Sequence, residues 1–159
     1  ANQGWPTKEH ALKMCQWLSE QGVVLIEQPM PKHMNEEHAW LCERVELPII
    51  ADEACQTYAD VAGLQPYYDG INIKLMKCGG VAEARKMIAL ARELGMQVMI
   101  GCMTETSAGI SAATTLSPLV DYADLDGHVL LANDPYEGIQ LVDGKLTLVN
   151  KPGTGVTLR

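Results

Sequence analysis

Basic residues are scarce in this chain of 159 residues, which contains 12 Lys and Arg against 20 Asp and Glu and carries a net charge of −8. Proteins that bind a nucleic acid duplex normally carry a basic stripe, so we expect no nucleic acid partner. Long apolar runs are absent too, because stretches such as Val23–Ile26 fall far short of the ~20 residues that cross a bilayer. The sequence therefore predicts no membrane partner.

Closely spaced cysteines and a secretory signal are also missing. The five cysteines are scattered along the chain, and none forms a Cys-x-x-Cys pair. This odd and widely spaced set disfavours a disulfide framework and a zinc site, and it predicts reduced thiols in a cytoplasmic protein. Apolar residues make up 47% of the chain and charged residues 20%, a balance typical of a globular domain and not of a disordered segment.

Short runs of β-forming residues recur at a spacing typical of one strand and one helix. Each run is nearly continuous in apolar residues instead of alternating, as in strands that are covered on both faces. We predict strands at Val23–Ile26, Leu47–Ala51, Gly70–Lys74, Gln97–Ile100 and Val120–Asp124.

The segments between these runs have helical periodicity. The clearest, Val81–Leu94, places Ala84, Met87 and Ala91 on one face. Further helices are predicted at Lys8–Gln21, Thr57–Leu64 and Ser107–Leu116, and Asn35 is expected to cap another whose inward residues are Ala39, Cys42 and Val45. Strands and helices in strict succession favour right-handed crossovers and a parallel sheet.

Beyond Asp124 the pattern changes. Asp143-Gly144 is a turn signal between alternating apolar runs, so residues 139–159 are expected to form a hairpin and a tail. A closed (β/α)8 barrel has eight strands and about 250 residues, and an open five-stranded sheet is the alternative. Because the chain also runs from Ala1 almost directly into a helix, we predict one α/β unit over residues 1–159. This unit would be a partial (β/α)8 barrel of about five C-terminal βα units.

Ionisable residues follow the apolar positions at four of the five predicted strand ends. They are Glu27, Asp52, Lys74 and, after the last strand, Asp124 with Asp126. Ligands of parallel α/β folds bind at the carboxyl ends of the strands, so we expect these side chains to surround one common mouth. Solvated loop charges would explain any single one of them, but they do not readily explain all of them at equivalent points.

The residue types suggest a chemistry for this mouth. The carboxylates of Glu27 and Asp52 could hold one hard cation, and Mg²⁺ prefers such oxygen ligands. Beside that cation the Lys74 amine would favour its neutral form and could act as a base, whereas the alternative is a salt bridge to one of the carboxylates. Asp124 and Asp126 form an anionic notch suited to a cationic group, with a second metal as the competing interpretation.

Other polar residues have structural interpretations at this point. The four histidines, which lie in polar contexts and are expected at the surface, are His10, His33, His38 and His128. Glu53 is expected to point away from Asp52 and to support it indirectly. Lys77 with Gly79-Gly80 is only superficially similar to a phosphate loop, so a tight turn is expected there.

Several of these motifs, in this order, resemble the enolase superfamily and within it the muconate-lactonizing subgroup. The motifs are Ile26-Glu27-Gln28-Pro29, Ala51-Asp52-Glu53, Ile73-Lys74-Leu75-Met76-Lys77-Cys78-Gly79-Gly80 and Asp124-Leu125-Asp126. Within the subgroup the chain is most similar to the dipeptide epimerases of the L-Ala-D/L-Glu type. The resemblance implies an enolase-type barrel that binds Mg²⁺ beneath an α+β capping domain.

The resemblance also implies a metal centre and an acid/base residue. Glu27 and Asp52 match the family's second and third metal ligands, and Lys74 matches the acid/base lysine on its sixth strand. The first metal ligand would directly precede Ala1, and the partner lysine, the early strands and the capping domain would also lie outside the given sequence. We therefore expect the missing N-terminal part of the same enzyme to complete the site, and the sequence leaves open whether the protein forms a homo-oligomer.

The implied function is Mg²⁺-dependent epimerisation of a small dipeptide substrate in cell-wall peptide metabolism. Lys74 would move the α-proton on one face of the substrate and the partner lysine on the other, by 1,1-proton transfer through an enediolate. Asp124 and Asp126 match the pair that holds the dipeptide's ammonium group, and Cys102 matches a residue that lines the pocket. The alternatives are a cycloisomerase, an o-succinylbenzoate synthase or an N-acylamino acid racemase of the same subgroup, or an inactive fragment or binding module.

Overall fold

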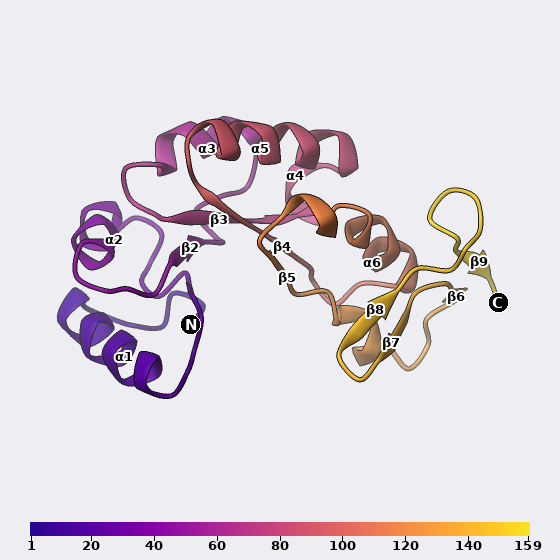
Figure 1. The fold of residues 1–159 in the computed structure, drawn as a ribbon, viewed down its shortest axis with the longest axis horizontal. Helices are drawn as coiled ribbons and strands as arrows, with labels where there is room; N and C mark the ends of the chain where they lie inside the picture. The colour runs from indigo at the N-terminus through magenta and orange to yellow at the C-terminus, as the bar shows by residue number, and fades with distance from the viewer.

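The structure is a computed structural model that describes all of residues 1–159. Its centre is a parallel sheet of five strands in the order β1-β2-β3-β4-β5. The strands are β1 (Ile26–Glu27), β2 (Ile49–Ala51), β3 (Gly70–Lys74), β4 (Gln97–Gly101) and β5 (Tyr122–Ala123). The sheet curls like part of a barrel wall (Figure 1). The predicted α/β fold, a partial barrel of five βα units, is confirmed.

Helices lie along the convex side of the curled sheet (Figure 1). They are α1 (Lys8–Glu20), α2 (Asn35–Cys42), α3 (Tyr58–Leu64), α5 (Val81–Glu93) and α6 (Ser107–Thr114). The short α4 (Leu75–Cys78) directly follows β3, and the 3-10 helices η1 (Ser117–Leu119) and η2 (Gly127–Leu130) precede and follow β5. In α5, Ala84, Met87 and Ala91 are buried at helical spacing, and Gly95 follows the helix with a φ of 73°. None of the helices combines the length and the apolar character that a bilayer crossing requires.

The strands divide the interior into two layers, because successive side chains of a strand point to opposite faces. The outward-facing side chains pack with the helices in one apolar core, and from the three central strands they are Ile49, Ala51, Ile71, Ile73, Val98 and Ile100. Ile50 and Met99 are also buried but lie outside that core, on the other face of the sheet. One face of the sheet thus supplies stability, and the concave face is left to carry a site.

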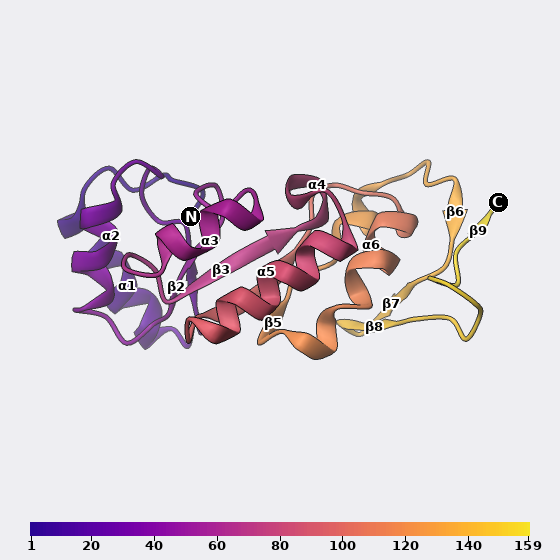
Figure 2. The same ribbon diagram turned by 90° about the horizontal axis from the view of Figure 1, so that it is seen from above.

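The C-terminal segment forms two small antiparallel pairs at one end of the molecule (Figure 2). β7 (Gln140–Val142) and β8 (Lys145–Thr147) make the predicted hairpin, whose turn residues Asp143 and Gly144 have φ angles of 49° and 73°. β6 (Tyr136–Glu137) pairs with β9 (Thr157–Leu158). The tail that the sequence predicted after the hairpin therefore contains a short strand near its end.

The first predicted strand is displaced along the chain. Val24 is 66% exposed, and pairing with β2 begins where the Ile26 amide donates to the Pro48 carbonyl at 2.9 Å. Residues 23–25 instead bring the chain back from α1 after Gly22, whose φ is 81°. The last strand is shorter than predicted, because only Tyr122 and Ala123 pair with β4.

The prediction that Asn35 caps α2 is wrong. Asn35 is the first helical residue, Met34 precedes it without a side-chain cap, and Asn35 Oδ1 is buried without a hydrogen-bond partner. Glu36 and Glu37 lie in the first turn, where acidic side chains favour the positive end of the helix dipole. Charge at the N-terminus thus replaces the expected cap.

The face of α2 that lies deepest in the core differs in part from the predicted one, because Cys42 and Val45 do pack against the core but are not its most buried residues. His38 and Leu41 are its fully buried residues, and the predicted inward residues Ala39, Cys42 and Val45 are only partly buried. A buried imidazole is tolerated here because polar groups in this part of the core form hydrogen bonds with it. His10 and His33 are exposed, as predicted, and His128 is partly buried.

His38 is held by three polar groups, one of which is the hydroxyl of the aromatic ring that it packs against. Its Nδ1 lies 2.7 Å from the Met34 carbonyl oxygen, which requires a hydrogen on Nδ1 and leaves Nε2 as an acceptor that faces the Gln28 amide at 3.4 Å. The ring packs against Tyr68 with centroids 4.6 Å apart. Burial holds the pKa of His38 below its ordinary value, so the native protein contains the neutral imidazole.

The stability of the protein should fall as the pH drops below about 6.5, the ordinary pKa of histidine. In that range the unfolded chain takes up a proton at His38 that the native state does not, which lowers the free energy of unfolding by up to about 1.4 kcal/mol per pH unit. Urea unfolding at about pH 7.5 and about pH 5.5, on either side of that pKa, measures this difference. The variant His38→Gln should lose this part of the pH dependence, and an unchanged slope would contradict the prediction.

Candidate active site

Polar side chains of β1, β2 and β3 meet on the concave face of the sheet. The register pairs Glu27 with Ile50, and Ala51 with Ile71, so Asp52 comes next to Asn72. Because paired residues of neighbouring strands point to the same face, Glu27, Asp52, Asn72 and Lys74 all belong to the layer opposite the main core. The curl of the sheet brings these positions together at the carboxyl ends of the strands.

Lys74 contacts both predicted metal ligands. Its Nζ donates to Asp52 Oδ2 at 2.6 Å and lies 4.0 Å from Glu27 Oε1. The two carboxylates therefore approach one point, as a shared cation requires. Of the two interpretations that the sequence left open for Lys74, the structure contains the salt bridge to a carboxylate.

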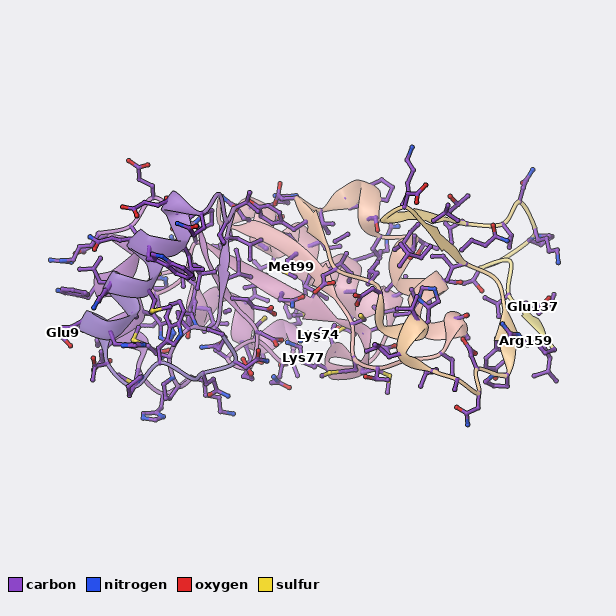
Figure 3. All side chains as sticks on the ribbon, turned by 90° about the horizontal axis from the view of Figure 1, so that it is seen from below. Glu9, Lys74, Lys77, Met99, Glu137 and Arg159 are labelled. Atoms are coloured by element: carbon purple, nitrogen blue, oxygen red, sulfur yellow. The ribbon has the colours of Figure 1, made fainter.

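Lys77 is a site residue that the sequence analysis missed. Its Nζ donates to Asp52 Oδ1 at 2.6 Å, to the Asp52 carbonyl at 2.7 Å and to the Asn72 carbonyl at 3.1 Å. Figure 3 shows Lys74 and Lys77 close together near the centre of the molecule. The available signal was the spacing of three residues on the turn α4, which places both lysines on one side of the chain.

Burial and ion pairing act in opposite directions at Asp52 and Lys74. Burial disfavours the charged carboxylate of Asp52, but hydrogen bonds from Lys74 and Lys77 outweigh it, so the pKa of Asp52 is lowered. Burial alone would lower the pKa of Lys74, yet the bond to Asp52 and the nearby Glu27 raise it. In this arrangement Lys74 is an ammonium ion, and the neutral form expected beside a divalent cation stays a prediction.

Glu27 is the less strongly compensated of the two carboxylates. Burial raises its pKa, although a hydrogen bond from Asn72 opposes the shift. The Asn72 Nδ2 atom donates to Glu27 Oε1 at 2.5 Å. Burial of the charged Glu27 carboxylate costs free energy, so an additional positive charge nearby would stabilise it.

Asn72 is a second residue that the sequence analysis did not select. Its side chain is buried and its Oδ1 has no hydrogen-bond partner. A Cβ atom at Gly101 would lie 2.7 Å from both terminal atoms of the Asn72 amide, so the glycine leaves room for that amide. The alternation Gly-Ile-Asn-Ile-Lys, which puts Asn72 on the same face as Lys74, was the signal for it.

Asp124 and Cys102 continue the same edge of the sheet. The Asp124 amide donates to the Ile100 carbonyl at 2.9 Å, and the register places Asp124 opposite Gly101, which in turn pairs with Lys74. Burial raises the pKa of the Cys102 thiol, and the carboxylates of Asp124 and Asp126 raise it further. The thiol is therefore protonated, and both aspartates, which are exposed, lie within electrostatic reach of it.

Two further glutamates lie near these strand ends. The Glu53 carboxylate has a buried Oε2 without a hydrogen-bond partner. Glu105 accepts a hydrogen bond from the Met103 amide at 2.9 Å, so its visible contact is with the backbone of its own loop.

The side chains at this mouth are of the right type to bind a hard cation, but they are too few to bind one alone. Glu27 and Asp52 supply carboxylate oxygens, the ligand type that Mg²⁺ prefers. No group of three or more His, Cys, Asp or Glu side chains lies close enough together to hold a metal by itself. A metal at this mouth would thus need further oxygen ligands, beyond the two carboxylates that this chain brings together.

The chain is similar to known proteins over nearly its whole length. Residues 1–159 match the family model of enolase C-terminal domain-like proteins. The chain is 55% identical over 156 residues to the L-Ala-D/L-Glu epimerase of Bacteroides thetaiotaomicron, a match that covers 98% of this chain and 41% of that protein.

Solved structures give the same result. The dipeptide epimerase of Enterococcus faecalis V583, in a complex with Mg and the dipeptide L-Leu-L-Tyr, has a TM-score of 0.90 at 37% identity, covering 99% of this chain and 46% of that one. The L-Ala-D/L-Glu epimerase of Bacillus subtilis, in a substrate-liganded complex, has a TM-score of 0.89 at 32% identity, covering 98% and 45%. The chain thus spans less than half the length of each of these relatives. It belongs to the enolase C-terminal domain-like family, and the predicted resemblance to the enolase superfamily and its dipeptide epimerases is confirmed.

Proposed function

We propose that this chain is the C-terminal part of a dipeptide epimerase, an isomerase that inverts an α-carbon by 1,1-proton transfer. One observation carries the proposal: Lys74 lies 2.6 Å from Asp52 and 4.0 Å from Glu27, so a basic side chain and two carboxylates meet at one point. The 55% identity to an L-Ala-D/L-Glu epimerase supports the same reaction. A segment that corresponds to the rest of the relatives' length would supply the rest of the site.

In this proposal Glu27 and Asp52 hold Mg²⁺, the metal present in the Enterococcus faecalis complex. The Ala1 amino group donates to the Glu27 carbonyl at 2.9 Å. A residue that precedes Ala1 would therefore emerge beside Glu27, where the family resemblance expects the first metal ligand. The bound metal supplies positive charge that stabilises the enediolate formed when the α-proton leaves.

Lys74 would exchange the α-proton on one face of the substrate, and Lys77 would keep Asp52 in place. Lys77 is fixed by three acceptor atoms, and its side chain is only 6% exposed. It can therefore remain the partner of Asp52 when Lys74 turns to the substrate. Lys74 has one hydrogen bond and one longer ionic contact, so fewer interactions hold its amine in place than hold that of Lys77.

Asp124 and Asp126 would bind the α-ammonium group of the dipeptide. Neither carboxylate forms an ion pair within the chain. Both are exposed near the end of β4, next to Cys102, which would line the pocket. A free anionic pair favours a dipeptide over the substrates of cycloisomerases, o-succinylbenzoate synthases or N-acylamino acid racemases, which carry no such ammonium group.

The setting of the reaction is part of the proposal. All five cysteines are free thiols, which supports a reducing compartment such as the cytoplasm. We place the substrate among the dipeptides of cell-wall peptide metabolism, since the relative at 55% identity is an L-Ala-D/L-Glu epimerase. A homo-oligomer stays an open expectation.

A dipeptide library in deuterated water tests this function directly. The complete protein, incubated with Mg²⁺, should incorporate deuterium at one α-carbon of a subset of dipeptides and should produce the epimer. Removal of the metal with EDTA should abolish both signals, and added Mg²⁺ should restore them. Mass spectrometry reads the incorporation, and a protein that exchanges no dipeptide under any of these conditions is not an epimerase.

Lys74→Ala should reduce α-proton exchange in the complete protein by about 10²- to 10⁴-fold, the range for loss of a general acid/base group. Lys86→Ala is the matched control, because Lys86 is exposed and pairs only with Glu83 on α5. Single-turnover exchange measured by NMR reports which face of the substrate is affected. If exchange on the same face persists in the Lys74 variant, the assignment is wrong.

Asp124→Asn should weaken the binding of dipeptides much more than the binding of their N-acetylated analogues. Loss of a hydrogen bond to a charged group costs about 1.5–3 kcal/mol, which corresponds to a rise in KM of about 10- to 100-fold. Inhibition constants for the N-acetylated analogues should change little, since they carry no ammonium group. Asp143→Asn, in the turn of the β7-β8 hairpin, is the control, and equal losses for both classes of ligand would contradict an ammonium site.

A further inference from the structure

Gln28 directly follows the predicted metal ligand Glu27 and has an unusual backbone. Its φ is 34°, in the left-handed region that residues other than glycine rarely adopt. Its side chain is fully buried. A buried, strained residue beside a site is a reason to ask what its side chain holds in place.

The strained backbone removes Gln28 from the regular strand ladder. Its amide still donates to the Ile50 carbonyl at 2.8 Å, so in a regular parallel ladder its carbonyl would accept from the Asp52 amide. The carbonyl instead accepts from the Gln3 amide at 2.7 Å. The left-handed turn has therefore left the Asp52 amide without its regular partner.

The Gln28 side chain replaces the backbone carbonyl as the hydrogen-bond acceptor for the Asp52 amide. Its Oε1 accepts from the amides of Asp52 and Ala54, each at 3.1 Å. One amide oxygen thus fixes the backbone on both sides of residue 53, at the point where β2 ends. The chain that carries the Asp52 carboxylate is tied to the residue that follows Glu27.

A second set of contacts fixes the orientation of the Gln28 amide. Its Nε2 donates to the Tyr68 hydroxyl at 2.9 Å and to the Met30 carbonyl at 3.2 Å, and His38 Nε2 lies 3.4 Å away. Tyr68 and His38 are themselves buried. With acceptors on the nitrogen side and two donors on the oxygen side, the amide has only one favourable orientation.

We propose that Gln28 is a positioning residue for the metal centre, with Tyr68 and His38 holding its amide in the required orientation. It acts through the backbone of Asp52 and so sets the distance between the Asp52 and Glu27 carboxylates. This inference rests on the proposed function, because it assumes that these two carboxylates bind a metal. A side chain that only filled the core would not need to place its oxygen on the two amides that flank residue 53.

The test measures metal affinity directly, with Mn²⁺ as the probe and the EPR signal of free Mn²⁺ as the readout. In the complete protein, Gln28→Leu should raise the Mn²⁺ dissociation constant by about 10- to 100-fold, the usual effect of losing a residue that supports a metal ligand. Tyr68→Phe removes only the hydroxyl and should cause a smaller rise of about 2- to 10-fold. Gln28→Glu keeps an acceptor oxygen for both amides and should restore part of the loss.

Thr114→Val is the matched control, because it removes a buried hydrogen bond within α6, from the Thr114 hydroxyl to the Ile110 carbonyl, without touching the site. It should lower the melting temperature and leave the Mn²⁺ dissociation constant unchanged. If Gln28→Leu does not fold, Tyr68→Phe decides, and a dissociation constant equal to wild type in either folded variant overturns the inference while the proposed function stands. A wild-type protein that binds no Mn²⁺ and exchanges no dipeptide overturns both.

Discussion

The Asp52 carboxylate, held between two lysine ammonium groups, is the interaction on which the site depends. A buried carboxylate is costly unless charge and hydrogen bonds compensate it. Lys74 and Lys77 both contact it at 2.6 Å, and the net result is a lowered pKa for Asp52. The arrangement keeps an anionic carboxylate at the mouth of the sheet.

The architecture separates stability from chemistry by the alternation of the strands. Outward-facing side chains of β2, β3 and β4 pack against the helices, while the concave face carries the carboxylates, Asn72 and Lys74. A substitution on the concave face of the sheet therefore does not require a matching substitution in the core on the other face. The chain nevertheless brings only two carboxylates together, and the relatives that it matches are more than twice as long.

Part of the site was predictable, because polar residues at the carboxyl ends of parallel strands come together at one edge of the sheet. Glu27, Asp52 and Lys74 follow apolar runs directly, and the carboxyl ends of parallel strands meet at one edge. Lys77 and Asn72 were missed for different reasons. Lys77 lies on a turn whose direction depends on how α4 leaves β3, and Asn72 is a neutral residue within a strand, where a titratable group was sought.

The amino-acid sequence by itself determined the order of strands and helices and the parallel sheet through apolar periodicity. Its short ordered motifs determined the family, and with the family the barrel type. Only the tertiary structure decided the burial of His38 and the role of Gln28. A histidine in a polar helix has no local signal for burial, since its hydrogen-bond partners come from other segments. Likewise the left-handed backbone of Gln28 and its bonds to Asp52 and Ala54 exist only when β1 and β2 lie side by side.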